Sequence, residues 1–248
     1  MEELEILGIK IHKIDMKEAL FIIENFIKKG DKSYLVLTPN AEIIVRSQTD
    51  KDFARILNSS DLSTADGASI LLASKFLYKE GIKSKVAGFD LMKRLFAKAV
   101  KKDYSIYLLG GKPGIAKKSK ERLSKEFPGI NIKAYHHGYL DKKLQSYVIQ
   151  DINKVKPDLL FVGMGVPLQE KFLDKNLEKL NVRVAMTVGG SFDILAGESK
   201  RAPLYWQKLY IEWLYRLIQE PSRLGRMMSL PRFMYLILFE KFKNIKYT

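Results

Sequence analysis

The stretch that most constrains the fold is residues 157–170, PDLLFVGMGVPLQE. Its apolar run over residues 159–162 has the length of a buried strand, and the glycines Gly163 and Gly165 follow it. Pro167 then stands where the first turn of a helix is expected, a position that tolerates proline. The stretch therefore predicts a strand, a tight turn and a helix. Glycines in such a turn let backbone N–H groups approach a phosphate, although an ordinary turn without a ligand is an equally good interpretation.

Apolar runs of strand length alternate with segments of helical spacing along most of the chain. The runs begin near residues 33, 104, 130, 159 and 183. Such alternation is typical of βα units, whose strands form a largely parallel sheet. We therefore predict an α/β fold of Rossmann-like, three-layer αβα type with a mainly parallel sheet. Smaller expectations are one short strand over residues 4–11, one continuous helix over residues 41–57 and a helix over residues 91–101 that Asp90 caps.

Polar residues follow the strand predicted at residues 33–37. Thr38 and Asn40 place a hydroxyl group and an amide at the carboxyl end of this strand. In an open α/β sheet this edge is where ligands bind, so both residues are candidates for substrate contacts. Thr and Asn are also frequent helix caps, and on chemical grounds alone capping is the slightly favoured interpretation.

Asp66 is the carboxylate whose surroundings most suggest a chemical role. It follows small residues and precedes Gly67, in a loop before a helical segment. A carboxylate held on a short loop at the edge of a site is a candidate general base. Asp before Gly is also a common turn pair, and without further context the turn is the preferred interpretation.

Glycine-rich loops follow two further strands. Gly110 and Gly111 come after the strand at residues 104–109, and Gly189 and Gly190 come after the strand at residues 183–188, with Asp193 shortly behind them. The first loop lacks the spacing and the Gly-Lys-Ser/Thr ending of a Walker A motif, yet it remains a plausible cradle for a phosphate or nucleoside. Tyr139, after the strand at residues 130–135, either stacks on a base or belongs to the core.

The residues present disfavour several cofactor classes. The chain has no cysteine, and the adjacent His136 and His137 lack a third ligand at a spacing suited to zinc. Asp50 and Asp52 form an Asp-x-Asp pattern inside a helical segment rather than at a strand end, so we reject them as a metal site. Leu168 stands where a dinucleotide fingerprint has its third glycine, which disfavours NAD. We expect neither a metal ion nor another cofactor.

Charge and hydropathy bound the partners and the location. The formal net charge of +15 favours a polyanionic partner: nucleic acid, an anionic membrane surface or a phosphorylated substrate. No run reaches the roughly 18 apolar residues of a membrane-spanning helix. The first fifteen residues are too acidic and too interrupted for a secretory signal, so we expect a protein on the cytoplasmic side of the membrane.

From Lys200 onward the alternation of strands and helices stops, and basic residues are interleaved with aromatic ones. We therefore expect two parts, an α/β core over residues 1–197 and a basic, aromatic-rich helical appendage over residues 198–248. Such an appendage fits a bilayer surface, a subunit interface or single-stranded nucleic acid, and the sequence does not separate these. Pro221 and Pro231 are expected to divide it into short helices.

Three arginines of this appendage suit a diphosphate. Arg216, Arg223 and Arg226 carry planar guanidinium groups, which bind phosphates in a bidentate manner and stabilise a leaving diphosphate. Contact with lipid headgroups and plain surface charge are the alternatives. We expect at least one of the three to reach the active site.

Together these motifs resemble the WecG/TagA/CpsF glycosyltransferase family over nearly the whole chain. The resemblance lies in TPN at 38–40, ADG at 65–67, LLGGKPG at 108–114, HGY at 137–139, VGMGVPLQE at 162–170, VGGSFDILAG at 188–197, and RAP, EWLYRL and EPSR within 201–223. The chain looks most like the TagA branch. That resemblance implies inverting, metal-independent transfer of N-acetylmannosamine from its UDP donor to undecaprenyl-diphosphate-linked N-acetylglucosamine, in a β-1,4 linkage, during wall teichoic acid biosynthesis.

The resemblance also implies roles for matching residues. Asp66 would accept the proton of the acceptor hydroxyl, and Thr38, Asn40 and Gln169 would orient the sugars. The appendage would dock on the inner face of the cell membrane as a peripheral protein, and a homo-oligomer is compatible with this scheme. Many relatives carry an arginine near residues 83–85, where this chain has lysines. The candidate substrate-binding residues are Gly110, Gly111, Tyr139, Gly163, Gly165, Gly189, Gly190, Asp193, Lys85, Arg216, Arg223 and Arg226.

Two other hypotheses stay open at the level of sequence. A related transferase would use another donor, such as UDP-glucose or the uronic acid of N-acetylmannosamine. A non-enzymatic, nucleic-acid-binding protein would explain the charge and the aromatic appendage, but it leaves the glycine loops at the strand ends unexplained. We therefore expect a UDP-sugar, a lipid-linked acceptor and an anionic membrane surface as partners, and no nucleic acid.

Overall fold

The structure is a computed structural model that describes residues 1–209, 211–221 and 224–245. Its centre is a six-stranded sheet in which every neighbouring pair of strands runs parallel. The strand order is β4-β3-β8-β7-β5-β6. The strands are β3 (Tyr34–Leu37), β4 (Leu62–Ser63), β5 (Ile106–Gly110), β6 (Ile132–His136), β7 (Leu159–Gly163) and β8 (Val184–Thr187).

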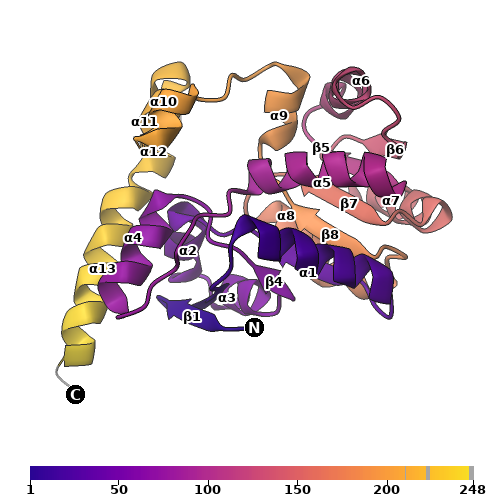
Figure 1. Ribbon diagram of the computed structural model, residues 1–248. Helices are drawn as coiled ribbons and strands as arrows, with labels where there is room; N and C mark the ends of the chain where they lie inside the picture. The colour runs from indigo at the N-terminus through magenta and orange to yellow at the C-terminus, as the bar shows by residue number, and fades with distance from the viewer. Residues whose placement is uncertain (210, 222–223, 246–248) are drawn as a thin grey trace.

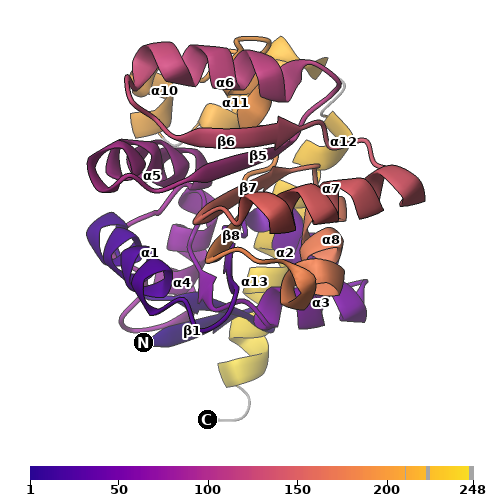
Figure 2. The same cartoon turned by 90° about the vertical axis from the view of Figure 1, so that its right-hand side faces the viewer.

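Helices cover both faces of the sheet, so the predicted three-layer architecture is confirmed (Figures 1 and 2). Alternate residues of one strand serve the two faces: Ile106 and Leu108 pack on one side, Tyr107 and Leu109 on the other. The helices on the first side are α1 (Met16–Lys29), α5 (Gly88–Lys102), α6 (Ile115–Glu126) and α9 (Ser191–Ala196). Those on the second are α2 (Ala41–Ser47), α3 (Lys51–Asn58), α7 (Lys142–Val155) and α8 (Leu168–Asn176), which the 3₁₀ turn η1 (Leu177–Lys179) continues.

The amino terminus forms a hairpin rather than the single strand expected over residues 4–11. Strands β1 (Glu3–Ile6) and β2 (Ile9–His12) pair antiparallel. Leu7 and Gly8, between them, both have positive φ angles, 50° and 77°. Two consecutive residues of this kind make the tight turn whose twist suits a hairpin. An alternating apolar pattern does not reveal such a turn when only one of its residues is glycine.

The helix expected over residues 41–57 is also interrupted. Helix α2 ends at Ser47 and α3 begins at Lys51. Asp50 starts the second helix because its carboxylate accepts the backbone N–H of Phe53 at 2.9 Å. This capping role, together with the 3.0 Å ion pair between Asp52 and Arg55, occupies the two carboxylates that the Asp-x-Asp pattern contains.

The carboxy-terminal segment is helical and its last helix belongs to the core. After α10 (Leu204–Lys208), α11 (Glu212–Gln219) and α12 (Leu224–Met227), helix α13 (Ser229–Ile245) packs against α2 and α4 (Ala68–Leu77), as Figure 1 shows. Phe233 and Ile237 of α13 are buried in the same apolar cluster as α2. Pro231 does not break this helix, contrary to expectation, because it lies in the first turn, where no intrahelical N–H donor is needed.

A membrane-spanning helix is not found in the described part of the chain, since none of its helices combines sufficient length with sufficient apolar character. The division of the chain at residue 197 stays a prediction.

Candidate active site

Asp66 and Thr38 meet at the carboxyl ends of two neighbouring strands. The backbone N–H of Asp66 donates to the carbonyl oxygen of Pro39 at 3.2 Å, which ties the loop after β4 to the loop after β3. The Oδ2 atom of Asp66 accepts the N–H of Gly88, the first residue of α5, at 3.2 Å. Thr38 packs on the same glycine so closely that an added Cβ would lie 2.7 Å from its Oγ1 atom. Three elements therefore fix the hydroxyl and the carboxylate beside each other.

The segment that carries Lys85 runs along the Asp66 loop. The N–H of Val86 donates to the carbonyl oxygen of Ala65 at 2.9 Å, and the Oγ1 atom of Thr64 donates to the carbonyl oxygen of Val86 at 3.1 Å. These bonds join the neighbours of Lys85 to the neighbours of Asp66. The structure thus brings this half-buried lysine to the same strand end as the candidate base.

Asn40 is a helix cap. Its Oδ1 atom accepts the backbone N–H of Ile43 at 3.1 Å at the start of α2, so the favoured interpretation of this residue is confirmed. The bond fixes the carboxamide with its oxygen toward the helix and its nitrogen away from it. A contact between that nitrogen and a sugar stays a prediction.

The glycines at the ends of β5, β7 and β8 bring three backbones into close contact. An added Cβ at Gly110 would lie 2.3 Å from the carbonyl oxygen of Gly163, and one at Gly163 would lie 2.7 Å from that of Gly189. Real side-chain atoms do not fit at such distances, so these positions require glycine. The first function of these residues is therefore close packing of the strand ends. Because the strand ends pack so closely, the loops that follow these strands lie near one another.

Tyr139 lies beside this glycine cluster. The N–H of Gly111 donates to the carbonyl oxygen of Gly163, and that of Gly138 donates to the carbonyl oxygen of Gly111, both at 2.9 Å. These bonds hold the loop after β6 against the loop after β5. Tyr139 is 63% exposed at this edge, so it is not a core residue, and its ring can stack on a ligand.

The remaining turn residues surround the same edge. A methyl group at Gly165 would meet no atom of the described chain within 4 Å, so this turn borders open space. Gly190 is exposed between β8 and α9, and an added Cβ there would lie 3.6 Å from the Oδ2 atom of Asp193. Asp193 thus lies next to the turn at Gly189 and Gly190, which it follows in the sequence.

Gln169 joins two of these loops from a buried position. Its Oε1 atom accepts the N–H of Gly189 at 3.0 Å, and its Nε2 atom donates to the Oε1 atom of Glu170 at 2.7 Å. Both side chains are almost fully buried. Burial raises the pKa of Glu170 to about 7, and its Oε2 atom has no hydrogen-bond partner in the described part of the structure. Glu170 was not among the site residues predicted from the sequence. The sequence feature that could have revealed Glu170 is a charged residue in the first turn of a helix that is buried there.

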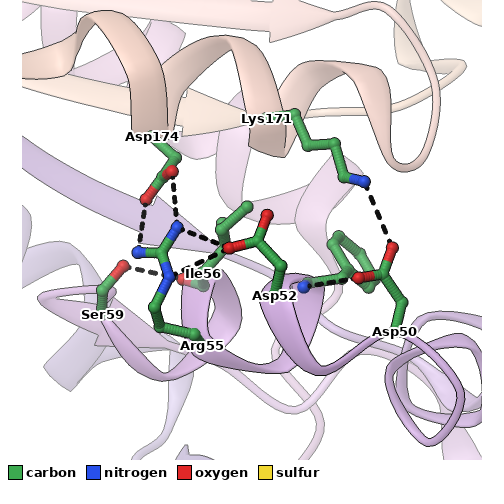
Figure 3. A network of polar contacts seen from close by, with 8 residues as sticks. Asp50, Asp52, Arg55, Ile56, Ser59, Lys171 and Asp174 are labelled. Carbon is green, nitrogen blue, oxygen red and sulfur yellow. Dashed lines mark hydrogen bonds and ion pairs between the residues drawn. The ribbon is translucent and has the colours of Figure 1, made fainter.

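Two ion pairs fasten the outer face of α8 to α3 (Figure 3). Lys171 contacts Asp50 at 3.2 Å, and Asp174 receives both terminal nitrogens of Arg55, at 3.0 and 2.8 Å. The helix that presents Gln169 and Glu170 is therefore held on its outer side as well. Arg55 and Asp174 are at the end of this network remote from the glycine turns.

Arg201 is a second residue that the sequence analysis did not assign to the site. Its Nη1 and Nη2 atoms bind the two oxygens of Asp90 at 2.6 and 2.7 Å, and its guanidinium lies 4.8 Å from the ring centroid of Phe89. Helix α5 starts at Gly88, so Asp90 lies inside its first turn and is not the expected cap. The pair fastens the start of the carboxy-terminal segment to the helix whose first N–H binds Asp66. Arg201 is also close enough to Asp66 for their charges to interact.

Of the three arginines predicted to bind a diphosphate, the structure describes the side chain of Arg226 alone. Arg223 and the side chain of Arg216 lie outside the described residues. Arg226 is exposed on α12. A contact between any of them and a diphosphate stays a prediction. In the residues that the structure does describe, no three His, Asp or Glu side chains gather in a group able to hold a metal ion.

This arrangement defines a Rossmann-like α/β protein whose candidate site lies at the carboxyl edge of a parallel sheet, where such folds bind nucleotides. Residues 4–247 match the model of the glycosyl transferase WecG/TagA/CpsF family, and the chain belongs to that family. It is similar to proteins named N-acetylglucosaminyldiphosphoundecaprenol N-acetyl-beta-D-mannosaminyltransferase. The one from Bacillus subtilis (strain 168) is 35% identical over 231 residues, which cover 90% of this chain and 89% of the relative. The one from Staphylococcus aureus (strain MRSA252) is 32% identical over 242 residues, 97% of this chain and 94% of the relative.

Proposed function

We propose that the protein transfers N-acetylmannosamine from UDP-N-acetylmannosamine to N-acetylglucosamine carried on undecaprenyl diphosphate, with inversion at the anomeric carbon. The observation that carries the proposal is the position of Asp66. Its carboxylate lies at the carboxyl edge of the sheet, oriented by the N–H of Gly88 and next to the hydroxyl of Thr38. Membership in the family and the names of the relatives support the transferred sugar and the lipid-linked acceptor, and UDP as the carrier of the donor sugar is part of the proposal.

The reaction is a direct displacement. Asp66 accepts the proton of the acceptor hydroxyl, and the hydroxyl oxygen attacks the anomeric carbon of the donor. The bond from this carbon to the UDP oxygen breaks at the same time, so the electron pair leaves with UDP. Attack from the face opposite UDP inverts the configuration. The short tether between Asp66 and α5 suits a base that must hold one orientation, because misplacement lowers the rate steeply.

The departing diphosphate needs compensation for its negative charge. Backbone N–H groups of the glycine turns and the ammonium group of Lys85 are the candidates on the core, and Arg226 is the candidate on the carboxy-terminal segment. Preorganised donors of this kind act on charge that develops in the transition state, which makes them effective catalysts. The exposed ring of Tyr139 would stack on the uracil ring. Asn40 would then contact the sugars, and the buried Gln169 would orient them through the turn at Gly189.

The carboxy-terminal segment is the proposed contact with the membrane that holds the acceptor. Large apolar side chains are exposed along it, and α13 alone exposes Tyr235, Phe239 and Phe242 at 67%, 61% and 63%. Exposed apolar side chains among lysines and arginines suit an anionic bilayer surface. Replacing these three residues with serine should abolish co-sedimentation with phosphatidylglycerol vesicles. These point changes are better than truncation, because truncation would also remove the buried Phe233 and Ile237.

The experiment that tests the proposed function is release of UDP from UDP-N-acetylmannosamine, with and without the lipid-diphosphate-linked acceptor. UDP-N-acetylglucosamine, which differs only in configuration at C2, is the matched control donor. We expect release that depends on the acceptor and on the N-acetylmannosamine donor, and that persists in the presence of a chelator. Equal release from other UDP-sugars would move the proposal to a related transferase, and a strict requirement for added magnesium would contradict the metal-free scheme.

A further inference from the structure

Glu170 is the most unusual buried group that the proposed mechanism does not use. It is 1% exposed, and its Oε2 atom has no partner in the described part of the structure. Buried carboxyl groups of this kind are costly to a fold and are common at functional sites. It directly follows Gln169 on α8, a residue that already contacts a loop of the site.

The hydrogen-bond partners of Gln169 allow only one orientation of its side-chain amide. The N–H of Gly189 can only donate, so the Oε1 atom of Gln169 must face it. The Nε2 atom of Gln169 then faces the opposite way, in a buried place where it needs an acceptor. The Oε1 atom of Glu170 is that acceptor, at 2.7 Å. If Glu170 did not accept this bond, the amide could rotate and turn its own N–H groups toward the N–H of Gly189.

The contact is not a by-product of helix geometry. Consecutive residues on a helix project in different directions and do not ordinarily touch. Gln169 and Glu170 nevertheless converge in the first turn of α8. The ion pairs from α3 hold the outer side of this helix through Lys171 and Asp174. The helix backbone that carries Gln169 and Glu170 is therefore held in place.

We propose that Glu170 is a positioning residue of the active site: its carboxyl group fixes the amide of Gln169 and, through it, the turn at Gly189 and Gly190 that borders the donor. The inference rests on the proposed function and deepens it. The group acts through hydrogen-bond geometry rather than through charge. The neutral acid retains its carbonyl oxygen as acceptor, so Gln169 keeps its partner in either protonation state.

Two conservative variants separate geometry from charge. Glu170→Asp keeps the carboxylate but withdraws its oxygens by one methylene group, beyond the reach of Gln169. Glu170→Gln removes the charge but keeps a carbonyl oxygen at the same distance. We expect Glu170→Asp to lower kcat for UDP release by about 10- to 100-fold, with a smaller change in KM. Glu170→Gln should restore most of that loss. Glu178→Asp and Glu178→Gln, at an exposed position beyond the end of α8, are the matched controls and should leave both constants unchanged.

A second measurement judges the proposal without turnover. Amide hydrogen exchange of Gly189 reports the bond to Gln169, and we expect it to accelerate about tenfold in Glu170→Asp but not in Glu170→Gln. Unchanged exchange in Glu170→Asp, or equal losses in both variants, would overturn the positioning role. If the wild-type protein releases no UDP from any donor, the proposed function fails, and the exchange measurement still decides whether Glu170 holds the turn.

Discussion

The two edges of the central sheet differ in how their polar groups are satisfied. The amino edge contains a hollow of about 910 Å³, and many charged residues line it. Several of these charged groups have partners: Lys32 pairs with Asp61, Arg55 pairs with Asp174, and the carboxylate of Asp158 accepts hydrogen bonds from the N–H and the hydroxyl of Ser105. The carboxyl edge instead presents glycine turns, a carboxylate held by a backbone N–H and a buried carboxyl oxygen without a partner in the described chain. We therefore infer the site from the polar groups of the carboxyl edge rather than from the volume of a hollow.

The two ends of β4 offer the sharpest test of this contrast, because Asp66 follows its carboxyl end and Asp61 precedes its amino end. Asp66→Asn should lower kcat for UDP release by about 10²- to 10⁴-fold, since the proposed general base is lost, with little change in the unfolding temperature. Asp61→Asn should instead lower stability and leave turnover unchanged. It weakens bonds to Lys32 and to the N–H of Leu35, and we expect a loss of about 1–3 kcal/mol in unfolding free energy with kcat unchanged. Near-normal turnover in Asp66→Asn would contradict the assignment.

The buried carboxyl group of Glu170 should make stability depend on pH. Its folded-state pKa of about 7 lies above the ordinary value of 4.5 because burial disfavours the charged form. The folded state therefore binds more protons than the unfolded state between these values, and stability falls as the pH rises through this window. Relative to Glu170→Gln, the wild-type protein should lose about 3 kcal/mol of unfolding free energy between pH 4.5 and pH 7. Urea unfolding of both proteins across this range gives the difference, and parallel curves would refute it.

The close packing of the strand ends predicts a local intolerance of side chains. In Gly163→Ala the new Cβ would meet the carbonyl oxygen of Gly189 at 2.7 Å and the ring of Phe192 at 2.8 Å. We expect a loss of about 1–3 kcal/mol in unfolding free energy. Gly225→Ala is the matched control, because its Cβ meets nothing within 4 Å in the described structure and α12 is helical there. Thermal unfolding measures both, and equal stability of the two variants would show that the strand ends can separate.

The smallest effect is expected at the end of the Figure 3 network that borders the amino edge, where Arg55 binds Asp174. Asp174→Asn weakens the pair with Arg55, whose side chain is more than half exposed and has a second partner in Asp52. Exposed pairs contribute little to stability because water screens them. We expect a slight decrease in Tm and unchanged kcat. A large loss of activity would mean that the outer fastening of α8 controls Gln169 more strongly than the inner bond does.

Much of the fold was predictable from the sequence, because five apolar runs with helical spacing between them specify βα units. Strand β4 was not predicted, since its two residues, Leu62 and Ser63, are too few to show a period. The Asp50 cap and the turn at Leu7 were also missed, because one capping carboxylate or one leucine with positive φ leaves little trace in a hydropathy pattern.

The candidate site was predicted in part. Thr38 and the glycine turns were singled out because turn residues at strand ends share one edge of a parallel sheet. Asp66 was singled out by its short loop before Gly67 and by the family resemblance, since the strand before it was not predicted. Arg201 and Glu170 were not, for a different reason in each case. Arg201 acts through Asp90, more than a hundred residues away in sequence. Glu170 acts through its neighbour, and the hydrogen bond that joins the two side chains is visible only in the three-dimensional structure.

The most direct test of the central claim, that ligands bind at the carboxyl edge, is hydrogen–deuterium exchange of the full chain with and without UDP. The account predicts slower exchange in peptides that contain Gly111, Gly165 and Gly190, and no change in those that contain Asp31, Lys156 or Asn181 at the amino edge. Protection of the amino-edge peptides alone would contradict this claim and would place the nucleotide in the hollow at the amino edge.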